Sequence, residues 1–408
     1  MSALFQEYRL ALRTVTPLFM AGAEARGAPE LRPPALRGAM RYWLRAAAGG
    51  VYGDDDNGLL RVREIEGRTF GSTDETKASA SAVTVRVSTQ SAANPMEFCK
   101  QATIRTIKNG KSIQQPTGRD YLYWSMAKSG RAQTENYQGP KQYWPDGMTF
   151  DLLLQKRPGA LRDEQALLWA TAAAWLLIQF GGVGSRSRRT AGSLSSARPQ
   201  EINGLKFAST ATSCIQLADE LAQGLKSVRS MFATTSTIPS VSDPSSFDVL
   251  HARSCRVWVL GIWADSSTAV ESVGAALRDF RSYREPDHAN VARWFGGNAI
   301  PTVERAAFGL PIPFHYSDGG PSGAVQGRLR NPTIDRRASP LWLKITRTQD
   351  GRYAGVATLF KSAFLPAGEK LYAKTRGASP PPANPPTDYS LIETWVASEF
   401  PNASEVSL

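Results

Sequence analysis

One segment decides the fold: Phe180-Gly181-Gly182-Val183-Gly184-Ser185-Arg186-Ser187-Arg188-Arg189-Thr190-Ala191-Gly192, a glycine- and arginine-rich turn that directly follows the most apolar stretch of the chain. That stretch, residues 165–179, consists of good helix formers and is hydrophobic on nearly all sides, which predicts a helix buried against a sheet. It is too short for a membrane span, which needs about 20 apolar residues. The sequence therefore predicts a core helix that holds a cationic turn in a fixed place.

The turn combines two features of a phosphate-binding loop. Its glycines allow positive φ and a close backbone approach to a ligand, and its three arginines carry guanidinium forks that match phosphate oxygens. Glycine is also the commonest stop signal after a helix, so Gly181 and Gly182 are equally explained as a cap. A cap does not explain three arginines within four residues, so we expect the turn to bind a polyanion as well. It is not a Walker loop, because it follows a helix and lacks the lysine.

The composition favours a nucleic-acid partner. The 408 residues carry a net charge of +12, and the first 200 hold 27 Lys and Arg against 17 Asp and Glu. The sequence shows no basic amphipathic anchor, so a polyanion such as RNA is a better partner than a membrane. Three scattered cysteines and three scattered histidines predict a reduced, cytoplasmic protein without a disulfide framework, structural metal or cofactor. The first residues contain charged side chains and lack the apolar core of a signal peptide.

The N-terminal part predicts a strand, a loop and a helix. Residues 4–16 alternate in the manner of a strand, and residues 34–48 place an apolar face beside Arg37, Arg41 and Arg45. Because four helical residues rise about 6 Å, this arginine row could follow a nucleic-acid backbone. A solvated face is the usual explanation of such a row. The absence of an acid at the i+4 positions favours a binding function here.

The middle of the first half contains a long polar insertion, residues 90–146. We expect its aromatic residues to pin it to the body by packing, although they could also stack on bases. The acidic run at residues 54–56 lacks the remaining ligands of a calcium loop, so we interpret it as a solvated turn. Strands are predicted at residues 82–88, 148–155 and, weakly, 202–207. With the two helices, the order is the split βαβ pattern of ferredoxin-like domains.

The second half repeats a mixed α+β pattern. A Ser-, Thr- and Pro-rich linker at residues 234–246 suits a boundary anywhere from 195 to 250. We predict a buried strand at 256–263, helices near 267–283 and 287–295, and a closing helix at 390–399. Residues 336–345 enter a strand that forms a hairpin with residues 353–360. We predict two domains, residues 1–210 with the insertion at 90–146, and residues 211–408.

Several ordered motifs resemble one family. They are Thr16-Pro17-Leu18-Phe19, Glu30-Leu31-Arg32-Pro33-Pro34-Ala35-Leu36-Arg37-Gly38-Ala39-Met40-Arg41-Tyr42-Trp43, Phe70-Gly71-Ser72, the glycine–arginine turn, Ala306-Ala307-Phe308-Gly309-Leu310-Pro311 and Arg336-Arg337-Ala338-Ser339-Pro340-Leu341. Together they resemble the RAMP superfamily of CRISPR-associated proteins, and the last two narrow the likeness to the first RAMP subunit of type III-B (Cmr) effector complexes. Thr190-Ala191 in the turn and the insertion depart from the pattern.

The resemblance implies two ferredoxin-like (βαββαβ) domains packed together. It also implies a non-catalytic RNA-binding subunit of an antiviral ribonucleoprotein that holds the guide RNA 3′ region and helps to capture target RNA beside other subunits. Motif matching places the RNA contacts on Arg32, Arg37, Arg41, Arg45, Gly181, Gly182, Gly184, Ser185, Arg186, Ser187, Arg188, Arg189, Arg336 and Arg337.

Two other functions stay open. Related RAMP proteins process guide RNA without metal, which would need a general base such as His251, His288 or His315. A pure assembly protein would bind neighbouring subunits and leave the RNA to them. For Arg305, Arg336 and Arg337, a tether to a carboxylate between domains explains the sequence as well as an RNA contact does.

Overall fold

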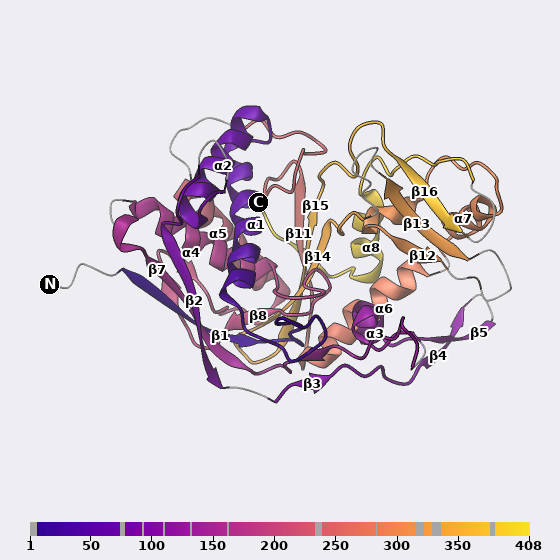
Figure 1. Ribbon diagram of the computed structural model, residues 1–408, viewed down its shortest axis with the longest axis horizontal. Helices are drawn as coiled ribbons and strands as arrows, with labels where there is room; N and C mark the ends of the chain where they lie inside the picture. Colours follow the sequence, from indigo (N-terminus) through magenta and orange to yellow (C-terminus); the bar gives the residue numbers. More distant parts are fainter. Residues whose placement is uncertain are drawn as a thin grey trace.

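A computed structural model of the chain has a mixed α+β fold with several small antiparallel sheets. It describes residues 6–73, 78–91, 94–108, 111–130, 133–160, 163–232, 239–282, 284–314, 316, 322–328, 336–375 and 380–408. Figure 1 shows two four-stranded sheets with helices between them and a smaller sheet at one end. Among the described residues, no helix is long and apolar enough to cross a membrane.

The first half is built on a four-stranded sheet in the order β2-β7-β1-β8. Its strands are β1 (Glu7–Thr14), β2 (Val83–Ser91), β7 (Thr149–Lys156) and β8 (Leu194–Ser196). Its helices are α1 (Pro33–Tyr52), α2 (Asp56–Phe70) and α4 (Glu164–Phe180). The alternating residues of β1 put Leu10 and Leu12 in the core, as period-2 patterning requires.

The second half repeats this arrangement in the order β14-β15-β11-β17. Its strands are β11 (Cys255–Trp263), β14 (Leu341–Arg347), β15 (Tyr353–Phe360) and β17 (Ser404–Glu405), and its helices are α6 (Ser266–Arg281), α7 (Asp287–Phe295) and α8 (Ser390–Glu399). A three-stranded sheet stands beside it, made of β12 (Ile312–Phe314), β13 (Gly323–Arg328) and β16 (Lys370–Thr375), and η3 (Glu304–Phe308) precedes it. When the strands of each four-stranded sheet are numbered along the chain, both sheets have the same order, 2-3-1-4.

The predicted central helix lies in an apolar cluster to which both halves contribute. The helix is confirmed as α4, which the Asp163 carboxylate caps by accepting from the Ala166 amide at 3.2 Å. α4 packs against β7 and β8 of the first sheet and against β14 and β15 of the second. A further helix, α5 (Cys214–Phe232), packs on α1, α4 and β11. Because α4 covers one face of β14 and β15 and α6 the other, both strands are almost wholly buried.

The structure corrects two sequence predictions. The fourth strand of the first sheet is β8, whereas residues 202–207 contribute only to the separate two-stranded ladder of β9 (Glu201–Ile202) and β10 (Leu205–Lys206). The acidic run is not a solvated turn, because Asp55 caps α2 through the Gly58 amide and Asp54 is buried. The Asp54 carboxylate accepts from the amides of Ser242 and Ser246, at 2.8 and 2.6 Å. It therefore anchors residues 239–246, the part of the predicted linker that the structure describes.

The insertion is pinned to the body by packing, as predicted. Its elements are β3 (Met96–Glu97), β4 (Ile104–Lys108), β5 (Lys111–Gln115), α3 (Gly118–Tyr123), η1 (Trp124–Met126) and β6 (Gln142–Tyr143), and the 3-10 turn η2 (Pro158–Ala160) lies beyond it. The rings of Phe98, Tyr123 and Tyr143 pack around Phe19, with ring centroids 5.1 to 5.7 Å from it. Trp124, by contrast, is 56% exposed.

The insertion helix α3 touches α6 of the second half backbone to backbone. The Glu271 carboxylate accepts from the amides of Gly118 and Arg119, at 2.6 and 2.9 Å. A Cβ added to Gly274 would lie 2.2 Å from the Gly118 carbonyl oxygen, which is closer than packed atoms tolerate.

We therefore expect Gly274→Val to separate α3 from α6, because overpacking costs about 1–3 kcal/mol. Limited trypsin digestion should then cleave the insertion after Arg119 or Lys128 faster than in the wild type. Gly139→Val is the matched control, since nothing lies within 4 Å of the added Cβ at that position. Equal digestion rates of the wild type and Gly274→Val would contradict this account of the contact.

A buried lysine joins the two sheets. Lys344 of β14 is 1% exposed, and its Nζ donates to the Leu194 carbonyl oxygen of β8 at 2.7 Å. Burial lowers the pKa of Lys344 to about 7, whereas an unfolded lysine has a pKa of about 10.4. Between those two values the unfolded chain binds more protons than the folded chain, so folding becomes more favourable as the pH rises.

We expect the free energy of unfolding of the wild type to rise relative to that of Lys344→Met by about 1.4 kcal/mol per pH unit above about pH 7. Methionine keeps the side-chain volume and removes the charge, so the difference between the two proteins isolates this lysine. Urea unfolding at a series of pH values measures it. Parallel pH profiles for the two proteins would show that Lys344 does not titrate in this window.

Candidate nucleic-acid interface

The start of α1 presents two unpaired arginines to solvent. Pro33 occupies the first helical turn and Arg32 precedes it. Arg32 and Arg37 are exposed, and among the described residues neither side chain has a hydrogen-bond or ion-pair partner. Below them, Leu36, Met40 and Trp43 are buried, so the predicted apolar face is confirmed.

The other two arginines of the row are held by α2. Nη1 of Arg41 and Nη1 of Arg45 both donate to Oε1 of Glu66, each at 2.9 Å. Nη2 of Arg41 also donates to the carbonyl oxygens of Phe70 and Gly71, at 2.5 and 2.7 Å. The sequence contains no acid at the i+4 positions of α1, but Glu66 supplies one from a helix that the sequence analysis did not predict.

The glycine–arginine turn is shaped by close backbone contacts. Gly181 ends α4 by donating to the Leu177 carbonyl oxygen at 3.0 Å, so the capping explanation is confirmed. Gly184 has φ +82°, and a Cβ there would lie 2.5 Å from the Phe19 carbonyl oxygen. The amides of Val183 and Ser185 donate to the carbonyl oxygens of Gly192 and Phe19, at 3.0 and 2.8 Å. These two amides are therefore used within the protein.

The three arginines of the turn point into the protein. Nε of Arg186 donates to the Leu122 carbonyl oxygen of the insertion at 2.6 Å. Nη2 of Arg189 donates to the Phe308 carbonyl oxygen at 3.2 Å, and this side chain is buried. Nη1 of Arg188 donates to the Ser339 carbonyl oxygen. The turn is therefore the point at which the insertion and the second half are tied to α4.

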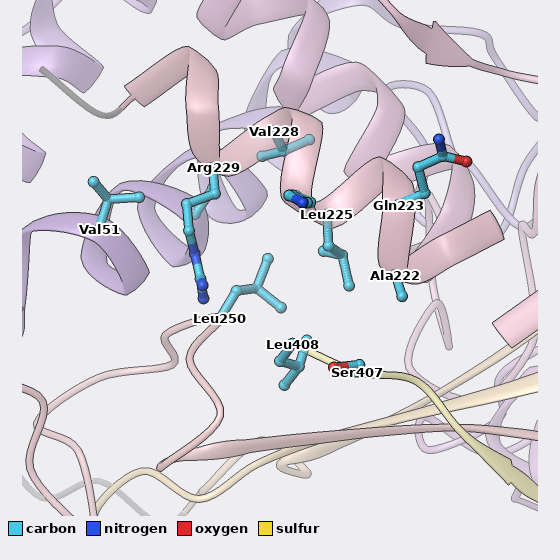
Figure 2. Close-up of a pocket in the computed structure, with 11 residues that line it drawn as sticks. Val51, Ala222, Gln223, Leu225, Val228, Arg229, Leu250, Ser407 and Leu408 are labelled. Atoms are coloured by element: carbon cyan, nitrogen blue, oxygen red, sulfur yellow. The ribbon is translucent and has the colours of Figure 1, made fainter. Parts of the chain in front are cut away.

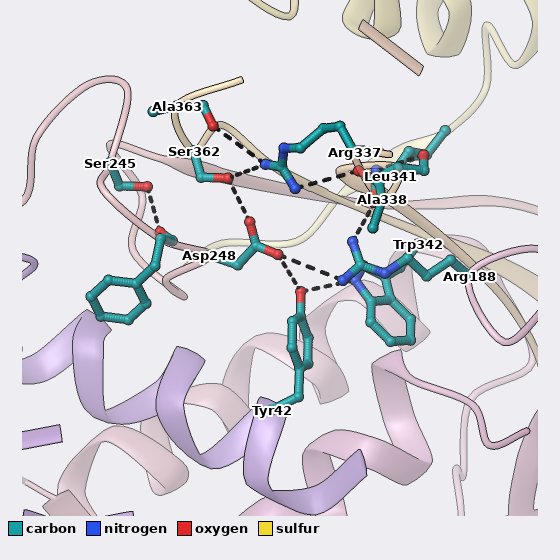
Figure 3. Close-up of polar contacts among 12 residues, drawn as sticks. Tyr42, Arg188, Ser245, Asp248, Arg337, Ala338, Leu341, Trp342, Ser362 and Ala363 are labelled. Atoms are coloured by element: carbon teal, nitrogen blue, oxygen red, sulfur yellow. Dashed lines mark hydrogen bonds and ion pairs between the residues drawn. The ribbon is translucent and has the colours of Figure 1, made fainter. Parts of the chain in front are cut away.

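Arg188 and Arg337 belong to a polar network around Asp248, shown in Figure 3. The Asp248 carboxylate accepts from the Tyr42 hydroxyl at 2.7 Å and from the Ser362 hydroxyl at 2.6 Å, and it lies 3.9 Å from Nη2 of Arg188. Nη2 of Arg337 donates to the Ser362 hydroxyl at 2.9 Å.

Tyr42 is the part of this network that belongs to α1. Burial, together with the negative charge of Asp248, raises the pKa of Tyr42 well above its ordinary value, so its hydroxyl stays a donor. The Trp342 indole nitrogen donates to the same hydroxyl at 2.9 Å. The Arg188 guanidinium stacks over both rings, 5.2 Å from Tyr42 and 4.6 Å from Trp342. The network therefore joins α1, the turn and β14.

Helix α1 and the glycine–arginine turn are in contact, but the arginines of α1 and those of the turn do not form one surface. The turn contacts α1 through Tyr42, whereas its neighbour Arg41 faces α2, because successive helical residues differ by about 100°. Arg32 lies near the turn because both bond to the same short segment, Phe19 and Met20. The Arg32 amide donates to the sulfur of Met20 at 3.5 Å, while the Ser185 amide donates to the adjacent Phe19.

Lys141 of the insertion adds a cation that the sequence analysis did not single out. Its Nζ donates to the Ser185 hydroxyl at 2.8 Å, and burial, aided by Arg26, lowers its pKa. Arg26 holds the insertion in place by donating to the Gly139 carbonyl oxygen at 2.6 Å. We call the surface formed by Arg32, Arg37, Lys141, Gly184 and Ser185 the outer rim. Arg336 is exposed, and among the described residues its side chain has no recorded partner.

The remaining candidate groups lie elsewhere. Among the residues that the structure describes, no three His, Cys, Asp or Glu side chains gather to hold a metal ion. Burial and the nearby Arg229 lower the pKa of His251, and His288 stacks on Tyr316 with ring centroids 4.7 Å apart. His315 lies outside the described residues.

A cavity of about 420 Å³ lies between α1 and α5, away from the outer rim. Figure 2 shows that Val51, Leu225 and Val228 line it from the two helices, together with Ser407 and Leu408. Its lining is largely apolar, and the charged side chains in the described part of that lining are Lys226 and Arg229. This cavity does not have the polar character of a nucleic-acid site.

Comparisons with known proteins agree with the motifs. A family model described as the RAMP superfamily matches residues 11–195. The chain is 33% identical over 198 residues to the CRISPR system Cmr subunit Cmr1-2 of Pyrococcus furiosus, a match that covers 45% of this chain and 91% of that protein. It is 26% identical over 359 residues to Cmr1-1 of the same organism, covering 87% of this chain and 88% of the relative.

Two solved structures share the fold. The crystal structure of Cmr1 from Pyrococcus furiosus, in the apo form, has a TM-score of 0.57 and 20% identity, with 98% of each chain covered. A chain in the cryo-EM structure of the type III-B Cmr-beta complex bound to cognate target RNA has a TM-score of 0.50 and 13% identity, covering 96% of this chain and 98% of that one. At these identities the likeness concerns the fold alone.

Proposed function

The chain belongs to the RAMP superfamily, as a relative of the Cmr1 subunits of CRISPR systems, and from this we propose that it is an RNA-binding subunit of a type III-B (Cmr) effector complex. In that complex it would hold the 3′ region of the guide RNA and help to capture target RNA. One structural relative belongs to a Cmr complex bound to target RNA, which supports this assignment of partners.

The observation that carries the proposal is the pair of unpaired, exposed arginines at the outer rim. Buried arginines that already donate to carbonyl oxygens gain little from a phosphate, whereas Arg32 and Arg37 can donate to one without breaking an existing bond. We propose that the outer rim, with Arg336 and the exposed edge of Arg45, contacts RNA directly.

The other predicted contacts take a supporting part in this proposal. Arg41 is held by Glu66 of α2, and Arg186 ties the turn to the insertion. Arg188 and Arg189 tie the turn to the second half, where Arg337 belongs to the Asp248 network. Gly181, Gly182 and Ser187 shape the backbone of the turn. Their effect on RNA would come through the shape of the surface.

Two ferredoxin-like domains are part of the same proposal. In each half a helix follows the first strand and another follows the third, and the strands have the same order, as the split βαβ pattern requires. We propose residues 1–210, with the insertion at 90–146, and residues 211–408 as the two domains. α5, at the start of the second, packs on both halves and would hold them together.

The test of the function is binding and cleavage by the full chain. Its affinity for labelled single-stranded RNA should fall as salt rises, with a slope of about −0.7 for each phosphate contacted, and the RNA should be recovered intact. A salt-independent affinity would contradict the proposal. Discrete cleavage products that disappear in His251→Ala or His288→Ala would instead support a metal-independent endoribonuclease.

A further inference from the structure

A second cationic site lies behind the turn, under the insertion. It is a cavity of about 350 Å³ between the β4–β5 hairpin, the end of α6 and β12, which lie close together in Figure 1. Arg278, Arg281, Arg305 and His288 line it, and its described lining includes no carboxylate. A cavity of this size falls in the range of about 300–1,000 Å³ that is typical of small-ligand sites.

Two carboxylates behind the lining neutralise only two of these arginines. Nε and Nη2 of Arg278 donate to the Asp279 carboxylate, at 3.1 and 2.8 Å. Nε of Arg305 donates to Oδ2 of Asp287 at 2.5 Å. The Arg281 guanidinium has no ion pair among the described residues and stacks over the rings of Phe308 and Tyr121, at 5.2 and 5.9 Å. Glu285 lies 3.5 Å from Nδ1 of His288, so among the described residues Arg281 is the lining arginine that is left without a carboxylate.

Unused donors gather at the same place. Nη2 of Arg305 has no hydrogen-bond partner although this side chain is only 6% exposed, and Nε of Arg281 is buried without a partner. The neighbouring Arg189 leaves its Nη1 unpaired as well. These are all of the buried, unpaired arginine nitrogens among the described residues. A buried donor without a partner costs free energy that an acceptor would recover.

The turn adds to the positive field of this cavity. Burial, followed by the charge of Arg281, lowers the pKa of Arg189 to about 9 and that of Arg186 to about 10. Both values are above neutral pH, so these arginines remain charged beside Arg281. A bound anion would relieve the repulsion among the cations.

We propose that this cavity binds the phosphate group of a nucleotide, with Arg281 and Arg305 as the donors. Guanidinium forks pair with phosphate oxygens through two parallel hydrogen bonds. The rings of Tyr121 and Phe314 also line the cavity. Phe314 is buried under the Arg305 guanidinium, whereas Tyr121 is only partly buried and offers a ring on which a base can stack. The ligand is a nucleoside monophosphate or a terminal phosphorylated nucleotide of RNA. This site is separate from the outer rim, since none of its lining residues belongs to that surface.

Calorimetric titration of the full chain with adenosine 5′-monophosphate, inorganic phosphate and adenosine tests the proposal. We expect adenosine 5′-monophosphate and phosphate to bind saturably and adenosine not to bind. Arg281→Gln should weaken the binding of adenosine 5′-monophosphate at least tenfold, while Arg284→Gln should not. Arg284 is the matched control because it loses the same charge three residues away and lines a different cavity.

Thermal unfolding provides a second readout on the same variants. Adenosine 5′-monophosphate should raise the melting temperature of the wild type and of Arg284→Gln, but not that of Arg281→Gln. Displacement of the nucleotide by a 5′-phosphorylated uridine decamer, but not by its 5′-hydroxyl form, would identify RNA as the source of the phosphate. Failure of both decamers to displace it would identify a free nucleotide. Absence of saturable binding to the wild type, or equal binding to Arg281→Gln, would overturn the proposal.

Discussion

Replacing Arg32 and Arg37 together with alanine is expected to weaken the binding of single-stranded RNA by at least about a hundredfold, since a hydrogen bond to a charged group contributes about 1.5–3 kcal/mol and each arginine would lose one. Both side chains are exposed and lack partners among the described residues, so their removal should not disturb the fold. The dependence of log affinity on log salt should also become shallower, by about 0.7 for each phosphate that the variant no longer binds.

The matched control for this pair is Lys226→Ala with Arg229→Ala. This double variant loses the same two charges, but on α5 at the edge of the apolar cavity. Its affinity for RNA should stay close to that of the wild type, apart from the small effect of net charge. If both double variants lost the same affinity, the protein would be binding RNA through its overall charge, and the outer rim would not be a specific RNA-binding surface.

Replacing Asp248 with alanine is expected to destabilise the protein by about 3–5 kcal/mol, the usual cost of leaving a buried charge without its partner. The Asp248 side chain is 12% exposed, and its removal leaves the hydroxyls of Tyr42 and Ser362 without their acceptor and Arg188 without its nearest carboxylate. Urea unfolding followed by tryptophan fluorescence measures the change, because Trp342 is part of the network.

Asp219→Ala is the control for this prediction, since Asp219 is an exposed carboxylate of α5 and its loss should change stability by less than about 0.5 kcal/mol. Asp248→Ala that remains folded should still bind RNA, because the outer rim does not include the network. An unchanged unfolding midpoint in Asp248→Ala would show that the network contributes nothing to stability.

The regular elements were predictable where one local pattern dominates. The central helix, the closing helix and the β14–β15 hairpin lie close to their expected residues. Each is recognisable because its apolar residues follow one clear pattern along the sequence. α2 and α5 were missed although each has the apolar face that predicts a helix. Missing α2 had a consequence for the site, because its Glu66 is the acid that holds Arg41 and Arg45.

The direction of an arginine was not predictable from its spacing. Arg188 and Arg37 occur in equally basic stretches, yet Arg188 stacks on Trp342, 154 positions further along the chain, while Arg37 faces solvent. Contacts between residues so distant in sequence are set by the packing of the two sheets around α4. The cationic cavity was likewise hidden, because Arg281 and Arg305 meet only through the docking of α6 against η3 and the insertion.

The central claim is that RNA lies along the outer rim, while the inward-pointing arginines hold the two halves together. The most direct measurement is a map of the sites at which single-stranded RNA crosslinks to the full chain under ultraviolet light, read by mass spectrometry. The account predicts adducts on peptides that contain Arg32 and Arg37 and on the peptide that contains Gly184 and Ser185. A map without adducts on these peptides, with its crosslinks on the far side of the second half, would contradict it.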